Sequence, residues 1–250
     1  MRVKKTRLDI LLSNITPSGE SLSRTRAASL IIEGKVAVNG EICTKPGAMV
    51  NTCDTVKILE DPNPYVSRGG LKLKSALNDF GIIVKNKKVM DIGASTGGFS
   101  DCLIKEGAYL VYCIDVGYGQ LDYKLRNSGK IKNIERTNIK KMPFETIGEK
   151  LDLCTIDVSF ISLKKVLPYT LKFLKKGGEI IALIKPQFET ENKKVLKKGV
   201  IKNENVYEDI INGIIGYSST LNLATKGVKK SCIKGKKGNT EFFIYLTKED

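Results

Sequence analysis

The sequence predicts an α/β protein with a mostly parallel β-sheet, preceded by a small α+β module. Apolar, strand-like runs alternate with helix-like segments from about residue 71 onward, which is typical of a parallel sheet with helical crossovers. The first part of the chain has a different rhythm, with one helical segment, a hairpin signal and a short strand. We therefore expect a module at residues 1–59, a linker at residues 60–70 and an α/β domain at residues 71–250.

The expected module is built from three local signals. The segment SLSRTRAASLIIEG, residues 21–34, has apolar residues at helical spacing and Ser23 as a candidate N-cap. KVAVNGEIC, residues 35–43, alternates around an Asn-Gly pair, which favours a β-hairpin. DTVKIL, residues 54–59, predicts a further strand. The next segment, EDPNPYVSRGG, has two prolines and two glycines, and this composition is typical of a linker.

The larger domain is expected to alternate between helices and strands. In order, we expect a helix over 71–81, a strand over 87–93, a helix over 97–107, strands over 109–117 and 151–159, a helix over 163–174, a strand over 178–186, a helix over 205–221 and a strand over 240–248. The segment 189–203 is polar and basic and is expected to be a loop. In an open parallel sheet, ligands bind beyond the carboxyl ends of the strands.

Composition narrows the possible functions. The formal net charge of +15 favours a polyanionic partner such as a nucleic acid, with a solvated basic surface as the alternative. The absence of histidine excludes histidine triads, histidine metal sites and a histidine general base, and we expect no metal centre. The six cysteines form no C-x-x-C pair and are expected to be free thiols. Without an apolar run near the ~20 residues of a spanning helix and without a signal peptide pattern, a cytoplasmic protein is expected.

The stretch DIGASTGGF, residues 91–99, is the first candidate for a binding loop, because it follows a strand and opens a helix. Its glycines permit close approach of a ligand, but Ser95 occupies the position of the second glycine of a dinucleotide-binding loop. Asp91 disfavours a pyrophosphate and suits a positively charged ligand, while Asp115 ends the next strand and is placed to accept hydrogen bonds from ribose hydroxyls. S-adenosylmethionine, a cationic nucleoside, fits both acids. A plain tight turn between strand and helix is the alternative.

Three more polar residues stand at strand ends. Asp157 ends the strand over 151–159, Lys185 closes an apolar run, and Glu241 begins the last strand. Each residue also has a purely structural interpretation. Asp157 would cap a helix, Lys185 would extend its ammonium group to solvent, and Glu241 would be an acid on an exposed strand. Their shared position at strand ends indicates a common site, because burying a lone ammonium or carboxylate is unfavourable.

These stretches together resemble a known family. The chain resembles the TlyA family, which joins an FtsJ-like S-adenosylmethionine-dependent RNA 2′-O-methyltransferase domain to an N-terminal RNA-binding module of the ribosomal S-four (alpha-L) type. The resemblance implies a Rossmann-like class I methyltransferase fold for the larger domain. The stretches that carry it are RLD (7–9), SRTRAASLIIEGKVAVNG (23–40), YVSRGGLKL (65–73), DIGASTGGF (91–99), IDVGYGQL (114–121), IDVSFISL (156–163), IKPQFE (184–189) and KGNTEFF (237–243).

The resemblance also implies site residues. The family's catalytic tetrad falls on Lys72, Asp157, Lys185 and Glu241, and Lys72 is chosen over Lys74 because it precedes the leucine after the Arg-Gly-Gly turn. Cofactor contacts are implied at Asp91, Gly93, Ser95, Thr96, Gly97, Gly98, Phe99 and Asp115, with Asn138 near the adenine. RNA contacts are expected at Arg7, Arg24, Arg26 and Lys35.

The implied activity is methyl transfer from S-adenosylmethionine to the 2′-hydroxyl of cytidine in ribosomal RNA of the small or large subunit. In this hypothesis Lys185 removes the hydroxyl proton, while Asp157 and Glu241 orient the lysines and the hydroxyl. Residues 1–60 carry a net charge of +3 and residues 191–237 a net charge of +7, so both regions are expected to contact RNA. Some family members are called haemolysins. A membrane-active protein and an RNA-binding protein without enzymatic activity therefore stay open as alternatives, although no stable membrane association is expected, and the sequence leaves the oligomeric state open.

Overall fold

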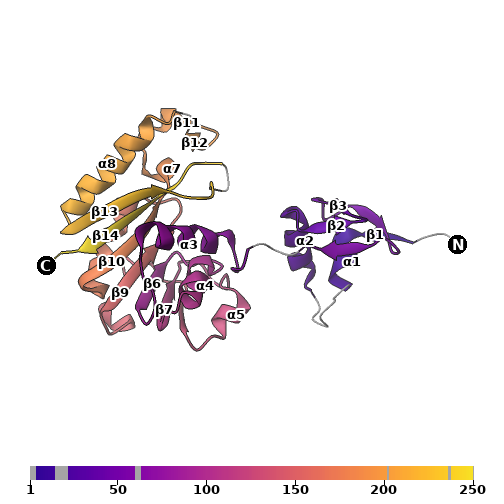
Figure 1. Cartoon of the computed structure of the whole chain (residues 1–250), viewed down its shortest axis with the longest axis horizontal. Coiled ribbons are helices and arrows are strands. Elements are labelled where there is room, and N and C mark those ends of the chain that lie inside the picture. Colours follow the sequence, from indigo (N-terminus) through magenta and orange to yellow (C-terminus); the bar gives the residue numbers. More distant parts are fainter. Residues whose placement is uncertain (1–3, 15–21, 60–62, 202, 236–237, 250) are drawn as a thin grey trace. The chain divides into compact units, whose positions relative to one another are not determined.

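The protein was analysed as a computed structural model that describes residues 4–14, 22–59, 63–201, 203–235 and 238–249. The chain forms two compact units, residues 1–62 and 63–250 (Figure 1). The second unit thus begins eight residues before the expected domain start. Residues 63–70 belong to it because helix α3 already begins at Arg68 and the Val66 amide donates a hydrogen bond to Asp101. Most of the described part of the expected linker is therefore structured.

The smaller unit packs two helices with short antiparallel strands. Its elements are β1 (Lys5–Arg7), α1 (Leu8–Asn14), α2 (Arg24–Ile32), β2 (Val36–Val38), β3 (Glu41–Ile42), β4 (Met49–Asn51) and β5 (Val56–Ile58). Strand β2 pairs with β3 and β5, and β1 pairs with β4. The expected helix and hairpin are confirmed, and the hairpin turns at Asn39 and Gly40, both with positive φ as a tight two-residue turn requires. Leucine, isoleucine and valine side chains from α1, α2 and the strands form its core.

A seven-stranded sheet forms the centre of the larger unit (Figure 1). The strand order is β13-β14-β10-β9-β6-β7-β8, in which β6 to β10 are parallel and β14 runs antiparallel to both of its neighbours. The strands are β6 (Lys88–Ile92), β7 (Leu110–Ile114), β8 (Ile131–Ile134), β9 (Leu151–Ile156), β10 (Leu174–Ile184), β13 (Leu223–Lys230) and β14 (Phe242–Lys248). The expected, mostly parallel sheet is confirmed, and β9, which leads to Asp157, lies beside β6.

Helices cover both faces of this sheet. Two apolar clusters divide the core: α3 (Arg68–Phe80) and α4 (Gly98–Lys105) pack in one, and α6 (Leu167–Thr170) and α8 (Val206–Ser219) in the other. The remaining short elements are α5 (Tyr123–Arg126), α7 (Pro186–Glu189), the strands β11 (Leu196–Lys197) and β12 (Val200–Ile201), and 3₁₀ turns at Phe144–Thr146, Leu163–Lys165, Leu171–Phe173 and Lys193–Val195. Within the described ranges, no helix combines the length and apolar character needed to cross a membrane.

Three expectations about these elements need correction. The expected helix over 163–174 is a four-residue α-helix between two 3₁₀ turns, with Pro168 in its first turn. The expected loop over 189–203 contains the small β11–β12 hairpin. Strands β8 and β13 were not predicted, because neither has a long apolar or alternating pattern.

Candidate active site

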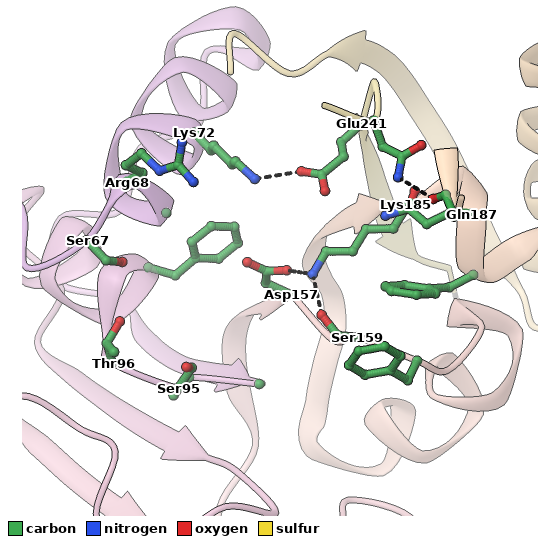
Figure 2. A pocket seen from close by; sticks show the side chains of 18 of the residues that line it. Ser67, Arg68, Lys72, Ser95, Thr96, Asp157, Ser159, Lys185, Gln187 and Glu241 are labelled. Atoms are coloured by element: carbon green, nitrogen blue, oxygen red, sulfur yellow. Dashed lines mark hydrogen bonds and ion pairs between the residues drawn. The ribbon is translucent and has the colours of Figure 1, made fainter. Parts of the chain in front are cut away.

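A cavity of about 820 Å³ opens where β6, β9 and β10 end and β14 begins (Figure 2). Because parallel strands end at the same edge of the sheet, residues far apart in the sequence meet there. The lining residues come from the start of α3, the glycine-rich loop, the segments after β9 and β10, the β11–β12 hairpin and the segment before β14. They are Ser67, Arg68, Gly69, Lys72, Gly93, Ala94, Ser95, Thr96, Phe99, Asp157, Ser159, Phe160, Lys185, Gln187, Phe188, Leu196, Gly199, Asn239 and Glu241.

Lys185 and Asp157 form the first ion pair of the cavity. Strands β9 and β10 are parallel neighbours, so the residues that follow their last paired positions lie side by side. The Lys185 Nζ atom is 2.5 Å from Asp157 Oδ1 and donates a hydrogen bond of 2.9 Å to Ser159 Oγ. The lysine side chain is 12% exposed and the aspartate side chain 24%, so the pair is only partly screened by water. An ion pair and a hydrogen bond thus hold the Lys185 nitrogen at one point of the cavity wall.

Lys72 and Glu241 form the second pair. Lys72 lies in the first half of α3, Glu241 immediately precedes β14, and the Lys72 Nζ atom is 2.6 Å from Glu241 Oε2. Their side chains are 12% and 3% exposed. A carboxylate this deeply buried depends on its partner, because an uncompensated buried charge is strongly destabilising. Gly235 makes room for it, since a Cβ atom there would lie 2.3 Å from Glu241 Oε1.

The four residues expected to form the tetrad therefore line one cavity. Figure 2 shows Lys72 pointing toward Glu241 and Lys185 pointing toward Asp157, with both pairs facing the same space. The sequence separation between Lys72 and Glu241 is 169 residues, and the fold closes this distance because α3 and β14 contribute side chains to the same apolar cluster. Their catalytic role stays a prediction at this point.

The glycine-rich loop contributes Gly93, Ser95, Thr96 and Phe99 to the cavity wall. Gly93 has a φ of +83°, and a Cβ atom there would lie 2.4 Å from the carbonyl oxygen of Asp157. Only glycine lets this loop pack so closely against the segment that carries Asp157. The loop and the Lys185–Asp157 pair are therefore built as one unit.

The other two glycines of the loop face away from the cavity. A Cβ atom at Gly97 would lie 2.3 Å from Leu125 Cδ1, and one at Gly98 would lie 2.2 Å from Ser67 Oγ and 3.1 Å from the Gly70 amide nitrogen. Gly97 thus allows the segment before and within α5 to pack on the loop, and Gly98 allows α3 and α4 to approach closely. Both were expected to contact a cofactor, but neither lines the cavity.

Asp91 also differs from its expected role. Its side chain is fully buried and accepts hydrogen bonds from Ser100 Oγ at 2.6 Å and Thr155 Oγ1 at 2.9 Å. Burial raises the pKa of the Asp91 carboxyl to about 6. The carboxyl group lies beneath the glycine-rich loop, and its two hydroxyl partners direct it into the core. Asp91 does not line the cavity, and the cofactor contact expected there stays a prediction.

Asp115 lies beside the loop rather than in the cavity lining. Its Oδ2 atom accepts a hydrogen bond of 2.8 Å from the Ser95 amide, and its Oδ1 atom one of 2.7 Å from the Gly117 amide. The Ser95 amide thus donates its hydrogen bond to a carboxylate of the protein. In a phosphate-binding loop, this amide would donate to the ligand. Each oxygen keeps a further lone pair for a hydroxyl donor. Asn138 is exposed, and its Oδ1 atom accepts from the Lys140 amide at 3.0 Å, outside the cavity lining.

Sequence reasoning missed an aromatic pair in the cavity wall. The Phe160 side chain is 90% exposed although its residue has a φ of +64°, which is rare for an aromatic residue. Its ring centroid lies 5.0 Å from that of Phe188. Both phenylalanines follow a strand end by a few residues, in IDVSFISL and IKPQFE, and this position was the signal available in the sequence.

Asn239 fixes another part of the wall. Its side-chain amide donates a hydrogen bond of 2.9 Å to the Gly199 carbonyl and accepts one of 3.1 Å from the Ile201 amide. Two opposed hydrogen bonds from one buried side chain attach the β11–β12 hairpin to the segment that carries Glu241. The hairpin contributes Leu196 and Gly199 to the cavity.

The residues expected to bind RNA lie in the smaller unit. Arg7 and Arg24 both contact Asp9, and their side chains are 45% and 58% exposed. Lys35 is 2.5 Å from Glu33 and its side chain is 19% exposed, so it is less available to a partner than expected. Arg26 lies within α2, and its side chain is outside the described part of the structure.

The strand order, the glycine-rich loop after the first strand of the sheet and the acid after the second define a Rossmann-like fold of the class I methyltransferase type. Residues 65–248 match the FtsJ-like methyltransferase family, and residues 6–56 match the S4 domain. The chain belongs to the FtsJ-like methyltransferases and, within them, to the TlyA family. The family expected from the sequence motifs is thereby confirmed.

Relatives match over nearly the whole chain. Hemolysin A of Brachyspira hyodysenteriae is 41% identical over 231 residues, which cover 91% of this chain and 95% of that protein. The 16S/23S rRNA (cytidine-2′-O)-methyltransferase TlyA of Mycobacterium tuberculosis (strain H37Rv) is 36% identical over 244 residues, covering 97% of this chain and 90% of that protein. A solved structure, "Putative hemolysin from Streptococcus thermophilus", superposes with a TM-score of 0.78 at 36% identity, covering 98% of this chain and 89% of that one.

Proposed function

We propose that this protein transfers a methyl group from S-adenosylmethionine to the 2′-hydroxyl of cytidine in ribosomal RNA. The observation that carries the proposal is the meeting of two lysine–carboxylate pairs around one cavity at the strand ends of an FtsJ-like domain. The relative named 16S/23S rRNA (cytidine-2′-O)-methyltransferase supports the choice of substrate, as does the S4 domain.

The cavity suits a cationic nucleoside better than a phosphorylated one. The Ser95 amide, which a phosphate-binding loop would offer to its ligand, is already bonded to the Asp115 carboxylate. In this proposal the cofactor is bound by Gly93, Ser95, Thr96 and Phe99, and Asp115 accepts hydrogen bonds from its ribose hydroxyl groups. The bound cofactor supplies an electrophilic methyl group on a positively charged sulfur.

Lys185 is the proposed general base. A ribose hydroxyl is a weak nucleophile at neutral pH, and it must lose its proton as its oxygen takes up the methyl group. With no histidine in the chain, an amine at the cavity wall is the acceptor that the fold offers. Asp157 and Ser159 fix the Lys185 nitrogen at the cavity wall. In this proposal the Lys185 amine takes up the proton that the ribose hydroxyl loses.

Lys72 and Glu241 are proposed to orient the acceptor ribose. Their ion pair faces the same cavity as the Lys185–Asp157 pair, and its low exposure keeps it rigid. Correct placement of the reacting oxygen contributes much of the rate in a transfer of this kind.

The exposed Phe160 and its neighbour Phe188 are proposed to stack on the base of the target nucleotide. Stacking of a base on an aromatic side chain is worth about 1–3 kcal/mol. The β11–β12 hairpin carries the exposed Lys197 and Lys198 next to cavity-lining residues, and these lysines are proposed to contact flanking phosphates.

Methylation of purified ribosomal subunits tests the proposed function. The subunits are incubated with the protein and S-adenosylmethionine, the RNA is digested, and nucleosides are identified by mass spectrometry. We expect new 2′-O-methylcytidine, which is absent when Lys185→Ala replaces the wild-type protein. Methyl groups on bases would contradict the assignment. Tight RNA binding without any methyl transfer would support the RNA-binding alternative.

A further inference from the structure

Asp9 is an acidic residue at the centre of the expected RNA-binding residues. Its side chain is only 4% exposed and forms ion pairs with two arginines. Arg7 donates from Nε and Nη2 to the two carboxylate oxygens, each at 3.0 Å, and Arg24 donates from Nε to Oδ2 at 3.0 Å. One buried carboxylate therefore fixes two guanidinium groups that come from different elements.

The backbone around this carboxylate is itself held in place. The Asp9 amide donates to the Pro46 carbonyl at 3.0 Å, and the preceding Leu8 amide donates to Ala48 at 2.8 Å. The Arg7 guanidinium lies near Gly47, since a Cβ atom added there would be 3.6 to 3.7 Å from three of its atoms. Arg7 is thus held at one edge by its two hydrogen bonds to Asp9.

The arginines still present most of their hydrogen-bond donors to a ligand. A guanidinium has five N–H donors. Asp9 engages two from Arg7 and one from Arg24, which leaves three and four outside this contact. Both side chains are about half exposed. An arrangement of fixed, outward-facing guanidinium donors suits the phosphate oxygens of RNA.

We propose that Asp9 is a positioning residue of the RNA-binding surface, which holds Arg7 and Arg24 in the orientation in which they contact RNA phosphates. The proposal rests on the RNA-binding part of the proposed function. It assigns a binding role to an acid that, by charge alone, repels RNA. Fixed guanidinium groups also lose less conformational freedom when RNA binds.

The test compares the direction in which two substitutions in the full-length protein change the affinity for RNA. Asp9→Asn and Glu41→Gln each raise the net charge by one, and Glu41 is an exposed residue of β3 in the same unit. If charge alone matters, both substitutions strengthen binding. In contrast, our proposal predicts that Asp9→Asn weakens binding to in-vitro-transcribed 16S and 23S ribosomal RNA by roughly five- to tenfold, while Glu41→Gln leaves it equal or slightly tighter. Fluorescence anisotropy at several salt concentrations measures both effects.

A double-mutant cycle separates positioning from direct contact. Arg7→Met and Arg24→Met together are expected to weaken binding and to lower the salt slope by about 0.9 for each lost phosphate contact. Adding Asp9→Asn to this pair is expected to change affinity by less than about twofold, because Asp9 acts only through the arginines.

The outcomes are distinguishable. If the arginine variants weaken binding but Asp9→Asn does not, the positioning role is wrong and the proposed RNA contacts stand. If the arginine variants bind like wild type, both the positioning role and the proposed contacts of this surface are wrong. A measurement on the wild-type protein covers the case in which Asp9→Asn does not fold: Nε–H order parameters of Arg7 and Arg24 are expected near the backbone value of about 0.85. Values typical of free, flexible arginines would overturn the proposal.

Discussion

Replacing Asp91 with asparagine tests what the acid beneath the glycine-rich loop does. The Asp91 carboxyl is fully buried, and burial raises its pKa from 3.8 to about 6. The folded protein therefore keeps a proton that the unfolded chain has already lost between these two pH values. The contribution of Asp91 to folding stability consequently falls as the pH rises through this window and changes little above it.

The size of this effect follows from the shift. A difference of about two pKa units corresponds to about 3 kcal/mol in the free energy of unfolding. The wild-type protein has this contribution at pH 4 and has lost it at pH 7. Asparagine is neutral and close in shape, so Asp91→Asn removes this pH dependence. We expect the variant to gain stability relative to wild type as the pH rises from 4 to 7. Affinity for S-adenosylmethionine is expected to change little, because the Asp91 side chain does not reach the cavity.

Urea denaturation between pH 4 and pH 8, followed by circular dichroism, measures the stability difference, and calorimetry measures cofactor affinity. Asp79→Asn is the matched control, since Asp79 is an exposed acid of the same unit. A constant stability difference between wild type and Asp91→Asn at every pH would refute the argument about the buried proton. Loss of cofactor binding in a folded Asp91→Asn protein would instead restore the direct contact expected from the sequence.

Three further predictions concern the cavity and its surroundings. Lys185→Ala is expected to lower the single-turnover rate at saturating cofactor by about 10²–10⁴-fold, and Lys185→Arg should not restore it because a guanidinium stays protonated. Near-normal rates for Lys185→Arg would rule out the general base. Gly97→Val is expected to destabilise the larger unit by about 2–6 kcal/mol, measured by urea denaturation, because the residue has a φ of +93° and its Cβ atom would lie 2.3 Å from Leu125. Loss of cofactor affinity at unchanged stability would contradict this prediction. Phe160→Ala should raise the KM for ribosomal subunits about tenfold without changing cofactor affinity, and an unchanged KM would exclude stacking.

The polar residues at strand ends could be predicted from the sequence, because the end of an apolar run is visible in a short stretch of the chain. Asp157 and Lys185 each follow an apolar run, and parallel strands end at one edge of the sheet, so their proximity was predictable. The partnership of Lys72 with Glu241 was different. It depends on where α3 packs relative to β14, and it was expected only through the resemblance to a family.

Some of the expected cofactor residues lie outside the cavity lining for a tertiary reason. The sequence of a loop motif does not reveal which neighbours an acidic side chain contacts, or against which neighbours a glycine packs. Asp91 faces Ser100 and Thr155, which come from α4 and β9, and Gly97 faces Leu125. Strand β13 escaped prediction because its lysines and its irregular pairing with β14 near Gly227 obscure any period-two pattern.

The contact at Gly98 has a consequence for Lys72. A side chain there requires the Ser67 hydroxyl to turn away and the backbone at Gly69 and Gly70 to shift by a few tenths of an ångström, because its first atom would lie 2.2 Å from Ser67 Oγ and 3.1 Å from the Gly70 nitrogen. That segment leads directly into the turn of α3 that carries Lys72, whose nitrogen must stay 2.6 Å from Glu241. A substitution at Gly98 is therefore transmitted through the start of α3 to the position of Lys72, although Lys72 itself is unchanged.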